Sequence, residues 1–155
     1  NIINEYNRWE ELWKINFASS VIINNYFIKN FQKNNFGRIL HFGSTVTDIK
    51  KGSPIYSSTK AATYDYVKKM GNNFSEKNVY INCIKTSIVS DKDNNWNKFE
   101  KMNTKKTIAK ILKENLSTEK FGRSKYFTPI ITYLCSKNNQ FITGSIIDID
   151  GGFIK

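Results

Sequence analysis

Residues 37–43 constrain the fold of this chain more than any other segment. After Gly37 the run reads Arg-Ile-Leu-His-Phe-Gly, and its apolar residues follow one another instead of alternating with polar ones. A strand of this kind is buried on both faces, as in a parallel sheet covered by helices on either side. Two further runs, 79–85 and 145–149, are predicted as strands, so the sequence indicates an α/β fold with about three parallel strands.

Helices are predicted before, between and after these strands. Ser53 and Pro54 suit the N-cap and the first position of a helix, and Thr128-Pro129 suggests a second such start. No repeat, low-complexity tract or linker divides the chain, so one domain over residues 1–155 is expected. The predicted helices span residues 5–34, 54–74, one or two amphipathic segments within 91–121, and 128–136.

The charge balance is strongly basic, with a formal net charge of +11. Clustered Lys and Arg would attract phosphates. Here the Lys residues are spread over every segment among many Asn and Ile, which indicates a compositional bias instead of a binding stripe. A basic nucleic-acid module remains a third interpretation, but no nucleic-acid partner is expected because no recognisable binding motif is found.

Cysteine usage and hydropathy favour a cytoplasmic protein. Cys83 and Cys135 fall in separate predicted elements without a Cys-x-x-Cys pair or a Cys/His cluster, so no metal site is expected. Two buried, reduced thiols suit the cytosol. Asn and Lys interrupt each apolar run well before the roughly 20 residues that a membrane span needs, and no signal peptide is recognised.

Tyr56 and Lys60 are the first candidates for chemistry. Residues four apart on a helix share one face, and an ammonium beside a phenol favours the phenolate and so lowers the phenol pKa. Tyr56 would lie in the first helical turn, where the helix dipole has the same effect. The alternative is a packed Tyr beside a solvated Lys, and this pair alone does not exclude it.

Ser44 and Asn16 are the second pair of candidates. Ser44 ends the strand at 37–43, where open α/β sheets place their ligands, although a serine there can simply cap a loop. Asn16 lies three residues after Trp13 on the apolar face of the first helix, so its amide either ties down neighbouring backbone or belongs to a site. His41, the only histidine, is interpreted as a strand residue and not as a catalytic base.

Several short motifs occur along the chain in a particular order. They are Asn16 within Trp9–Phe17, the run Gly37–Ser44, Tyr56-Ser-Ser-Thr-Lys60, Ile81–Ile84, Phe141-Ile-Thr-Gly144, and Asp148-Ile-Asp-Gly-Gly152. Together they resemble the classical members of the short-chain dehydrogenase/reductase family over nearly the whole chain. The resemblance implies the C-terminal half of a Rossmann-like, doubly wound parallel sheet, because the family's Gly-rich strand-turn-helix start is not found.

The resemblance implies an oxidoreductase that uses NAD or NADP. It would transfer hydride reversibly between the nicotinamide and a small-molecule carbonyl or alcohol substrate. By resemblance, Tyr56 would be the general acid/base, Lys60 would hold the nicotinamide ribose and lower the Tyr56 pKa, Ser44 would bind the substrate oxygen, and Asn16 would hold a proton-relaying water.

Further expectations come from the same resemblance. Thr86, Ile88 and Val89 would contact the cofactor, although Thr86-Ser87 stands where the family has Pro-Gly. Residues 91–121 would form the substrate lid, and the helices at 5–34 and 54–74 would pair with a second copy in a homo-oligomer. The competing interpretation is a truncated, non-catalytic fragment that acts only as an oligomerisation or interaction module. The sequence names neither the substrate nor the choice between NAD and NADP.

Overall fold

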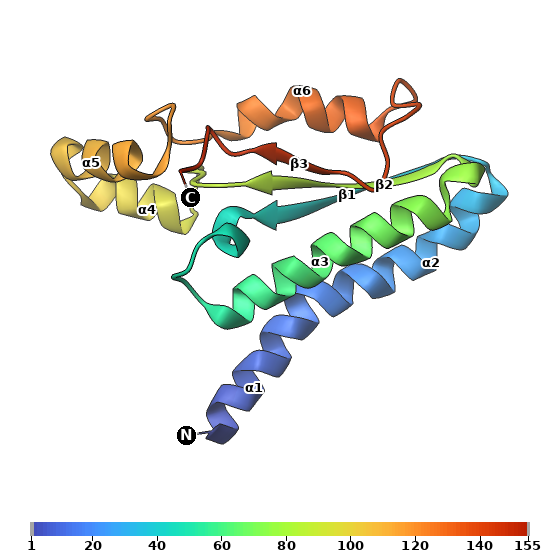
Figure 1. The fold of residues 1–155 in the computed structure, drawn as a ribbon, viewed down its shortest axis with the longest axis horizontal. Coiled ribbons are helices and arrows are strands. Elements are labelled where there is room, and N and C mark those ends of the chain that lie inside the picture. Colours follow the sequence, from blue (N-terminus) through green and yellow to red (C-terminus); the bar gives the residue numbers. More distant parts are fainter. Residues whose placement is uncertain (1, 155) are drawn as a thin grey trace.

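The computed structural model describes the backbone of residues 2–154 and the side chains of residues 5–154. Three parallel strands form one sheet in the order β1-β2-β3, which confirms the predicted fold class (Figure 1). The strands are β1 (Gly37–Ser44), β2 (Val79–Thr86) and β3 (Ile146–Ile149). The helices are α1 (Ile2–Trp13), α2 (Ser19–Lys33), α3 (Pro54–Asn73), α4 (Asn95–Met102), α5 (Lys105–Asn115) and α6 (Ser124–Cys135).

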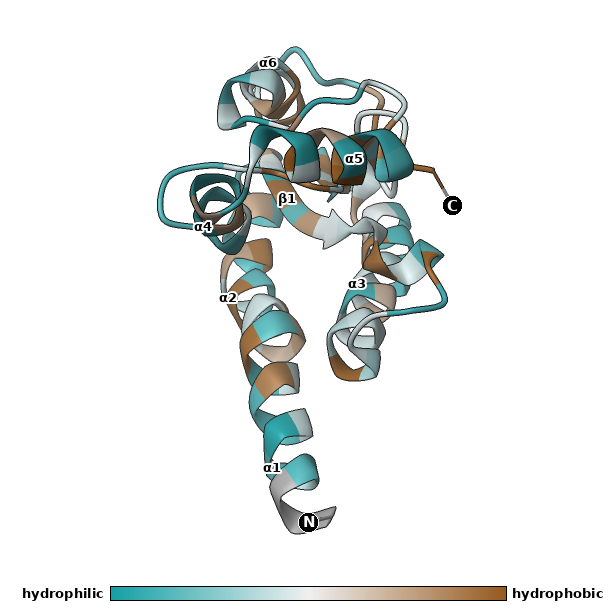
Figure 2. Cartoon of the chain, turned by 90° about the vertical axis from the view of Figure 1, so that its left-hand side faces the viewer, coloured by the Kyte–Doolittle hydropathy of each residue, from teal (hydrophilic) through white to brown (hydrophobic). Residues whose placement is uncertain are grey.

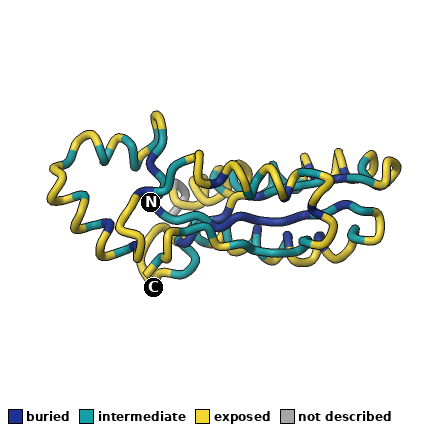
Figure 3. Tube along the Cα trace, turned by 90° about the horizontal axis from the view of Figure 1, so that it is seen from above, coloured by how far each residue is buried: buried dark blue, intermediate teal, exposed yellow. Residues whose placement is uncertain are grey.

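Helices cover both faces of the sheet. α2 and α3 lie on one face and α6 lies on the other (Figure 1). Val67 of α3 packs with Ile81 on the first face, and Leu134 of α6 packs with Ile84 on the second. Figure 3 shows the buried residues concentrated along the strands, between layers of helices that are partly exposed. β2 is therefore buried on both faces, as parallel strands usually are, whereas β1 is buried only in part, with Phe42 50% exposed, so the prediction that residues 37–43 are buried on both faces is wrong.

The helix predicted over residues 5–34 is interrupted in an informative way. α1 and α2 are joined without a break by a π-helical segment, Lys14–Ala18, with Asn16 at its centre. A π segment adds a residue to one helical turn, a change that hydrophobic periodicity does not reveal. α1 extends beyond the sheet and away from the rest of the chain (Figures 1 and 2).

The predicted start of α6 is wrong. The Thr128-Pro129 dipeptide predicted a helix start, but α6 begins at Ser124 and contains Pro129. The Asp91 carboxylate accepts a hydrogen bond from the Ser124 N–H at 2.6 Å, so a residue distant in sequence caps this helix. Pro129, which lacks an N–H, leaves the Lys125 carbonyl without its usual helical donor.

The remaining elements follow the sequence prediction closely. Ser53 caps α3, and its Oγ accepts a hydrogen bond from the Tyr56 N–H at 3.3 Å. The 91–121 region contains α4 and α5, which lie together beyond one end of the sheet (Figure 1). Its role as a substrate lid stays a prediction.

The two cysteines differ in exposure. Cys83 is buried in β2, but Cys135 is exposed because it ends α6 with its side chain toward solvent, so the prediction of two buried thiols is wrong for Cys135. Within the described residues, no cluster of His, Cys, Asp and Glu is able to hold a metal ion. No helix in this part of the chain has the length and apolar character to cross a membrane.

Candidate active site

Tyr56 and Ser44 lie within hydrogen-bonding reach of each other at the carboxyl end of β1. Ser44 is the last residue of β1, and Tyr56 lies in the first turn of α3. Burial raises the pKa of the half-buried Tyr56 phenol, whereas its hydrogen bond with the Ser44 side chain acts in the opposite direction. Ser44 Oγ also accepts a hydrogen bond from the Val46 N–H at 3.2 Å, so its own proton is available for an oxygen atom nearby.

Lys60 lies one turn after Tyr56 on the same side of α3. Its Nζ is 5.4 Å from the centre of the Tyr56 ring and donates a hydrogen bond to the Phe42 carbonyl at 2.8 Å. An ammonium has three N–H donors, so two remain for other acceptors. Burial lowers the pKa of Lys60. The net direction for the Tyr56 pKa is upward, which is opposite to the direction that the sequence argument expected from Lys60 alone.

Asn16 and Lys60 line one cavity of about 290 Å³, called here the Lys60 cavity. The Asn16 side chain donates a hydrogen bond to the Leu12 carbonyl at 3.1 Å, which leaves its amide oxygen available. His41 lines the same cavity with its Nε2 3.0 Å from the Asn24 amide nitrogen, and burial, assisted by Lys60, lowers its pKa to about 4. His41 is therefore a neutral strand residue near pH 7. The other lining residues are Ile15, Ser20, Leu40, Phe42 and Thr63.

A second cavity, of about 300 Å³, opens beside Ser44 and is called here the Ser44 cavity. One wall comes from Trp96 of α4, whose ring also contacts Phe99 and Phe121. Aromatic and aliphatic side chains therefore form much of the wall of this cavity beside a few polar residues, an arrangement that would favour a largely apolar ligand. The lining residues are Ser44, Thr45, Val46, Ile49, Ser87, Ile88, Trp96, Asn115 and Phe153.

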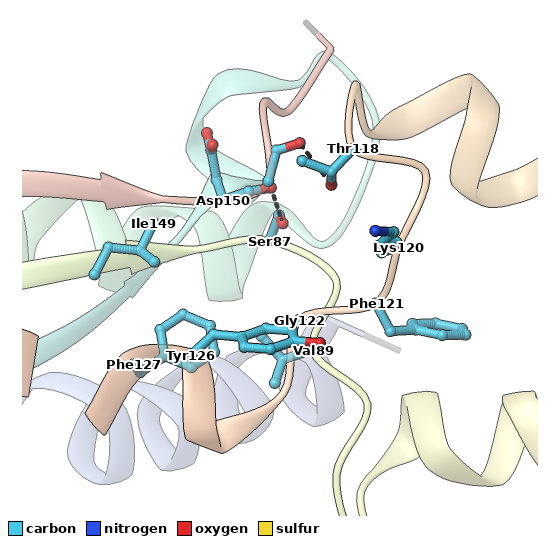
Figure 4. A pocket seen from close by; sticks show the side chains of 11 residues that line it. Ser87, Val89, Thr118, Lys120, Phe121, Gly122, Tyr126, Phe127, Ile149 and Asp150 are labelled. Atoms are coloured by element: carbon cyan, nitrogen blue, oxygen red, sulfur yellow. Dashed lines mark hydrogen bonds between the residues drawn. The ribbon is translucent and has the colours of Figure 1, made fainter. Parts of the chain in front are cut away.

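The three residues expected to contact a cofactor do not share one cavity. Ile88 lines the Ser44 cavity, and the Thr86 hydroxyl instead donates a hydrogen bond to the Gly43 carbonyl at 3.5 Å. Val89 lines a separate cavity of about 400 Å³, where Tyr126 and Phe127 project from α6 (Figure 4). The structure places Ser44 beside Tyr56 and Tyr56 beside Lys60, but Ser44 lines one cavity while Lys60 and Asn16 line another, so the four predicted catalytic residues do not share one cavity either.

Two features near the site were not found by sequence reasoning. The buried Lys85 ammonium lies 2.8 Å from an Asp48 carboxylate oxygen and 3.1 Å from one of Asp148. A lysine in a strand predicted to be buried was the available signal for this cluster. The Tyr64 hydroxyl bonds to the backbone of Ser44, and nothing in the local pattern marks that contact.

Comparison with known proteins identifies the family. A family model described as "Enoyl-(Acyl carrier protein) reductase" matches residues 3–154. The chain belongs to the short-chain dehydrogenase/reductase family. As a member of that family it spans little more than half the length of the curated relatives it matches. The 3-oxoacyl-[acyl-carrier-protein] reductase FabG of Aquifex aeolicus is 26% identical over 153 residues, which cover 93% of this chain and 56% of the relative.

Other relatives agree with this short-chain dehydrogenase/reductase assignment. The dehydrogenase/reductase SDR family member 6 of Rattus norvegicus is 23% identical over 147 residues, covering 94% of this chain and 60% of the relative. A mutant 4-hydroxyisoleucine dehydrogenase complexed with NADH and succinate has a TM-score of 0.82 at 24% identity, over 94% of this chain and 59% of that one. The 3-oxoacyl (acyl-carrier-protein) reductase of Agrobacterium tumefaciens C58 with NADP bound gives 0.78 at 21% identity, over 89% and 53% respectively. These structures establish the shared Rossmann-like fold.

Proposed function

We propose that this chain carries the catalytic half of an NAD(P)-dependent oxidoreductase acting on a small-molecule carbonyl or alcohol. The observation that carries the proposal is the grouping of Ser44, Tyr56 and Lys60 at the carboxyl end of β1, with Asn16 on the same cavity as Lys60. Open α/β sheets bind their ligands at this end of the strands. The family membership, and relatives whose names include NADH or NADP, support the same chemistry.

Each of the four side chains has a separate role in the proposed reaction. In the reducing direction the Tyr56 hydroxyl gives its proton to the substrate oxygen, and in the oxidising direction its phenolate takes that proton back. Ser44 donates a hydrogen bond to the same oxygen as negative charge develops on it. Lys60 stabilises the phenolate. A water molecule held between Asn16 and Lys60 passes the proton on to solvent in the oxidising direction and returns a proton from solvent to Tyr56 in the reducing direction.

The residues present fit the nicotinamide end of a dinucleotide. Lys60 keeps two N–H donors for ribose hydroxyls because, among the residues whose side chains are described, its Nζ donates to the Phe42 carbonyl alone. Ile88 and Val89 would add apolar contacts, and Thr86, whose hydroxyl bonds to Gly43, would contribute less. The bound nicotinamide would supply or accept the hydride. The apolar walls of the Ser44 cavity favour a carbonyl compound with an apolar substituent.

A titration of NADH and NADPH, followed by reduction of a panel of ketones and 3-oxoacyl thioesters, tests the proposal. The 155-residue chain should be measured alone and with an added Gly-rich first half taken from a full-length relative. Turnover that falls by about 10²- to 10⁴-fold in Tyr56→Phe would support the assignment. Turnover that is unchanged in Tyr56→Phe would exclude Tyr56 as the acid/base.

A non-catalytic module is the second candidate function. Apolar side chains exposed along α1 and α2 favour it, because large exposed patches commonly mark contacts with other proteins. If neither the chain alone nor the reconstituted pair binds a dinucleotide while self-association is strong, this second candidate replaces the first. Under either candidate we propose a homo-oligomer in the cytoplasm.

A further inference from the structure

Tyr64 makes an unusual pair of hydrogen bonds with the backbone of one residue. It lies two turns after Tyr56 on α3 and is half-buried. Its hydroxyl accepts a hydrogen bond from the Ser44 N–H at 2.7 Å and donates one to the Ser44 carbonyl at 2.8 Å. A single phenol thus bonds to both backbone polar groups of the residue that ends β1.

Gly43 makes this contact possible. A β-carbon on Gly43 would lie 2.4 Å from the nearest Tyr64 ring carbon and 2.5 Å from the Tyr64 oxygen, distances that real contacts do not reach. Any larger residue at position 43 would therefore displace the ring from Ser44. Gly43 and Tyr64 form a matched pair in which one residue supplies space and the other fills it.

The bonds to Tyr64 act at the last paired residue of β1, where Ser44 lies opposite Thr86. Ser44 is the last residue of β1, and the 3₁₀ turn Thr45–Asp48 follows it directly. The direction of the Ser44 hydroxyl depends on the torsion angles at this junction. Because Tyr64 and Tyr56 belong to the same helix, a bond from Tyr64 to Ser44 fixes the serine relative to the Tyr56 phenol.

We propose that Tyr64 is a positioning residue, which holds the Ser44 backbone so that the Ser44 hydroxyl meets the Tyr56 phenol. This inference rests on the proposed function, because it assigns Ser44 and Tyr56 to one reacting oxygen. Tyr64 touches no reacting atom itself and acts through Ser44. Burial raises the pKa of the Tyr64 phenol, so the phenol keeps the proton that it donates to the Ser44 carbonyl across the neutral range.

Tyr64→Phe is the direct test, and Tyr66→Phe is its matched control. Tyr66 lies on the same helix, and its hydroxyl accepts a hydrogen bond from the Asn24 side chain instead of the Ser44 backbone. In an isotope-labelled sample, the Ser44 amide should exchange its hydrogen about ten-fold faster in Tyr64→Phe and should be unchanged in Tyr66→Phe. This readout needs no catalytic activity. An unchanged Ser44 amide in Tyr64→Phe would overturn the inference.

The second readout is the steady-state kinetics of the chain combined with the added Gly-rich first half. Tyr64→Phe should lower kcat by about ten-fold or more with little change in KM, because it disturbs geometry and not substrate binding. The apparent pKa of Tyr56 in the pH profile should move upward, because the Ser44 hydrogen bond that lowers it is weakened. A folded Tyr64→Phe variant with faster Ser44 exchange, but with wild-type kcat and pH profile, would refute the positioning role.

A double mutant separates positioning from general stability. Gly43→Ala should reproduce the Tyr64→Phe effects in the wild-type background, and it should add almost nothing in a Tyr64→Ala background, where the ring is gone. If the effects of Gly43→Ala and Tyr64→Ala on Ser44 exchange and on kcat were fully additive, the inference would be overturned. If wild-type protein shows no turnover with any dinucleotide, the proposed function fails, while the Ser44 exchange rates still decide whether Tyr64 fixes Ser44.

Discussion

At the scale of single residues, Arg38 shows how a charged group becomes structural at the start of a partly buried strand. Its guanidinium donates hydrogen bonds to the carbonyls of Asn78 and Asn139 at 2.7 Å each and to the Ser136 carbonyl at 3.3 Å. It also lies 4.2 Å from the Tyr80 ring centre. These bonds join β1 to the loops around β2 and α6, so the residue stabilises the fold away from the site.

Replacement of Arg38 by Lys should therefore be costly. An ammonium retains the charge but lacks the planar arrangement of donors, so several carbonyls would lose their partners. We expect the free energy of unfolding to fall by about 2 kcal/mol, measured by urea denaturation. Arg8→Lys, on the exposed face of α1, is the control and should change it little. Equal stability of both variants would contradict this structural role for Arg38.

At the scale of elements, α4 is attached to the body of the domain by a charged network. The Glu100 carboxylate of α4 accepts hydrogen bonds from Arg123 at 2.7 and 3.1 Å and one from the Ser90 hydroxyl. Arg123 directly precedes α6, so the network joins the helix bearing Trp96 to the far side of the sheet. The hydrogen bonds from Arg123, followed by the bond from Ser90, hold the pKa of Glu100 below its usual range.

This attachment should weaken in acid. A carboxyl group with a lowered pKa in the folded state stabilises that state above its unfolded pKa of about 4.3, and the contribution is lost as pH falls through the folded value. Tryptophan fluorescence should report loosening of α4 below about pH 4, and Glu100→Gln should show that loosening already at pH 7. Glu114→Gln, in an exposed pair with Lys110, is the control. Identical acid transitions in wild type and Glu100→Gln would argue against the network.

At the scale of the whole molecule, two surfaces of the described chain are uncovered: one edge of β1 and the apolar face of α1 and α2. β1 pairs with β2 on one side only, and among the described strands none lies on its other edge. An uncovered edge of this kind is a template for association. α1 and α2 also expose apolar side chains, with Tyr26 79% and Ile22 69% exposed. The exposed apolar residues of this surface are Tyr6, Trp9, Trp13, Ile15, Ile22, Ile23, Tyr26 and Phe27.

We expect the α1–α2 surface to mediate self-association. The double substitution Ile22→Glu/Tyr26→Glu should shift the protein toward monomers at micromolar concentration, because burying two charges at an apolar interface is unfavourable. Light scattering coupled to size-exclusion chromatography measures this directly. Phe141→Ser, which removes an exposed ring from the loop before β3, is the control. A wild-type protein that is strictly monomeric would rule out this assembly.

Sequence reasoning recovered the elements whose signal is local. The unbroken apolar run of β1 and the Ser53-Pro54 cap depend on neighbouring residues, and both were located within one residue. The start of α6 escaped because Asp91 caps it from another part of the chain. The four proposed catalytic residues were found through spacing and family resemblance. Tyr64 was not, because a hydrogen bond between residues twenty positions apart leaves no pattern in either segment.

The π-helical segment around Asn16 has a consequence for the rotational phase of the first helix. An α-helix turns by about 100° per residue, and a π segment accommodates one additional residue in its turn. Removing one residue from Lys14–Ala18 would let the segment become α-helical. α1 would then keep its present orientation, because the π turn already accommodates that residue, whereas a change to α geometry at the present length would rotate everything before it by about 100° relative to α2. The π turn thus sets the direction in which the α1 aromatic rings point, and the same turn presents Asn16 to the Lys60 cavity.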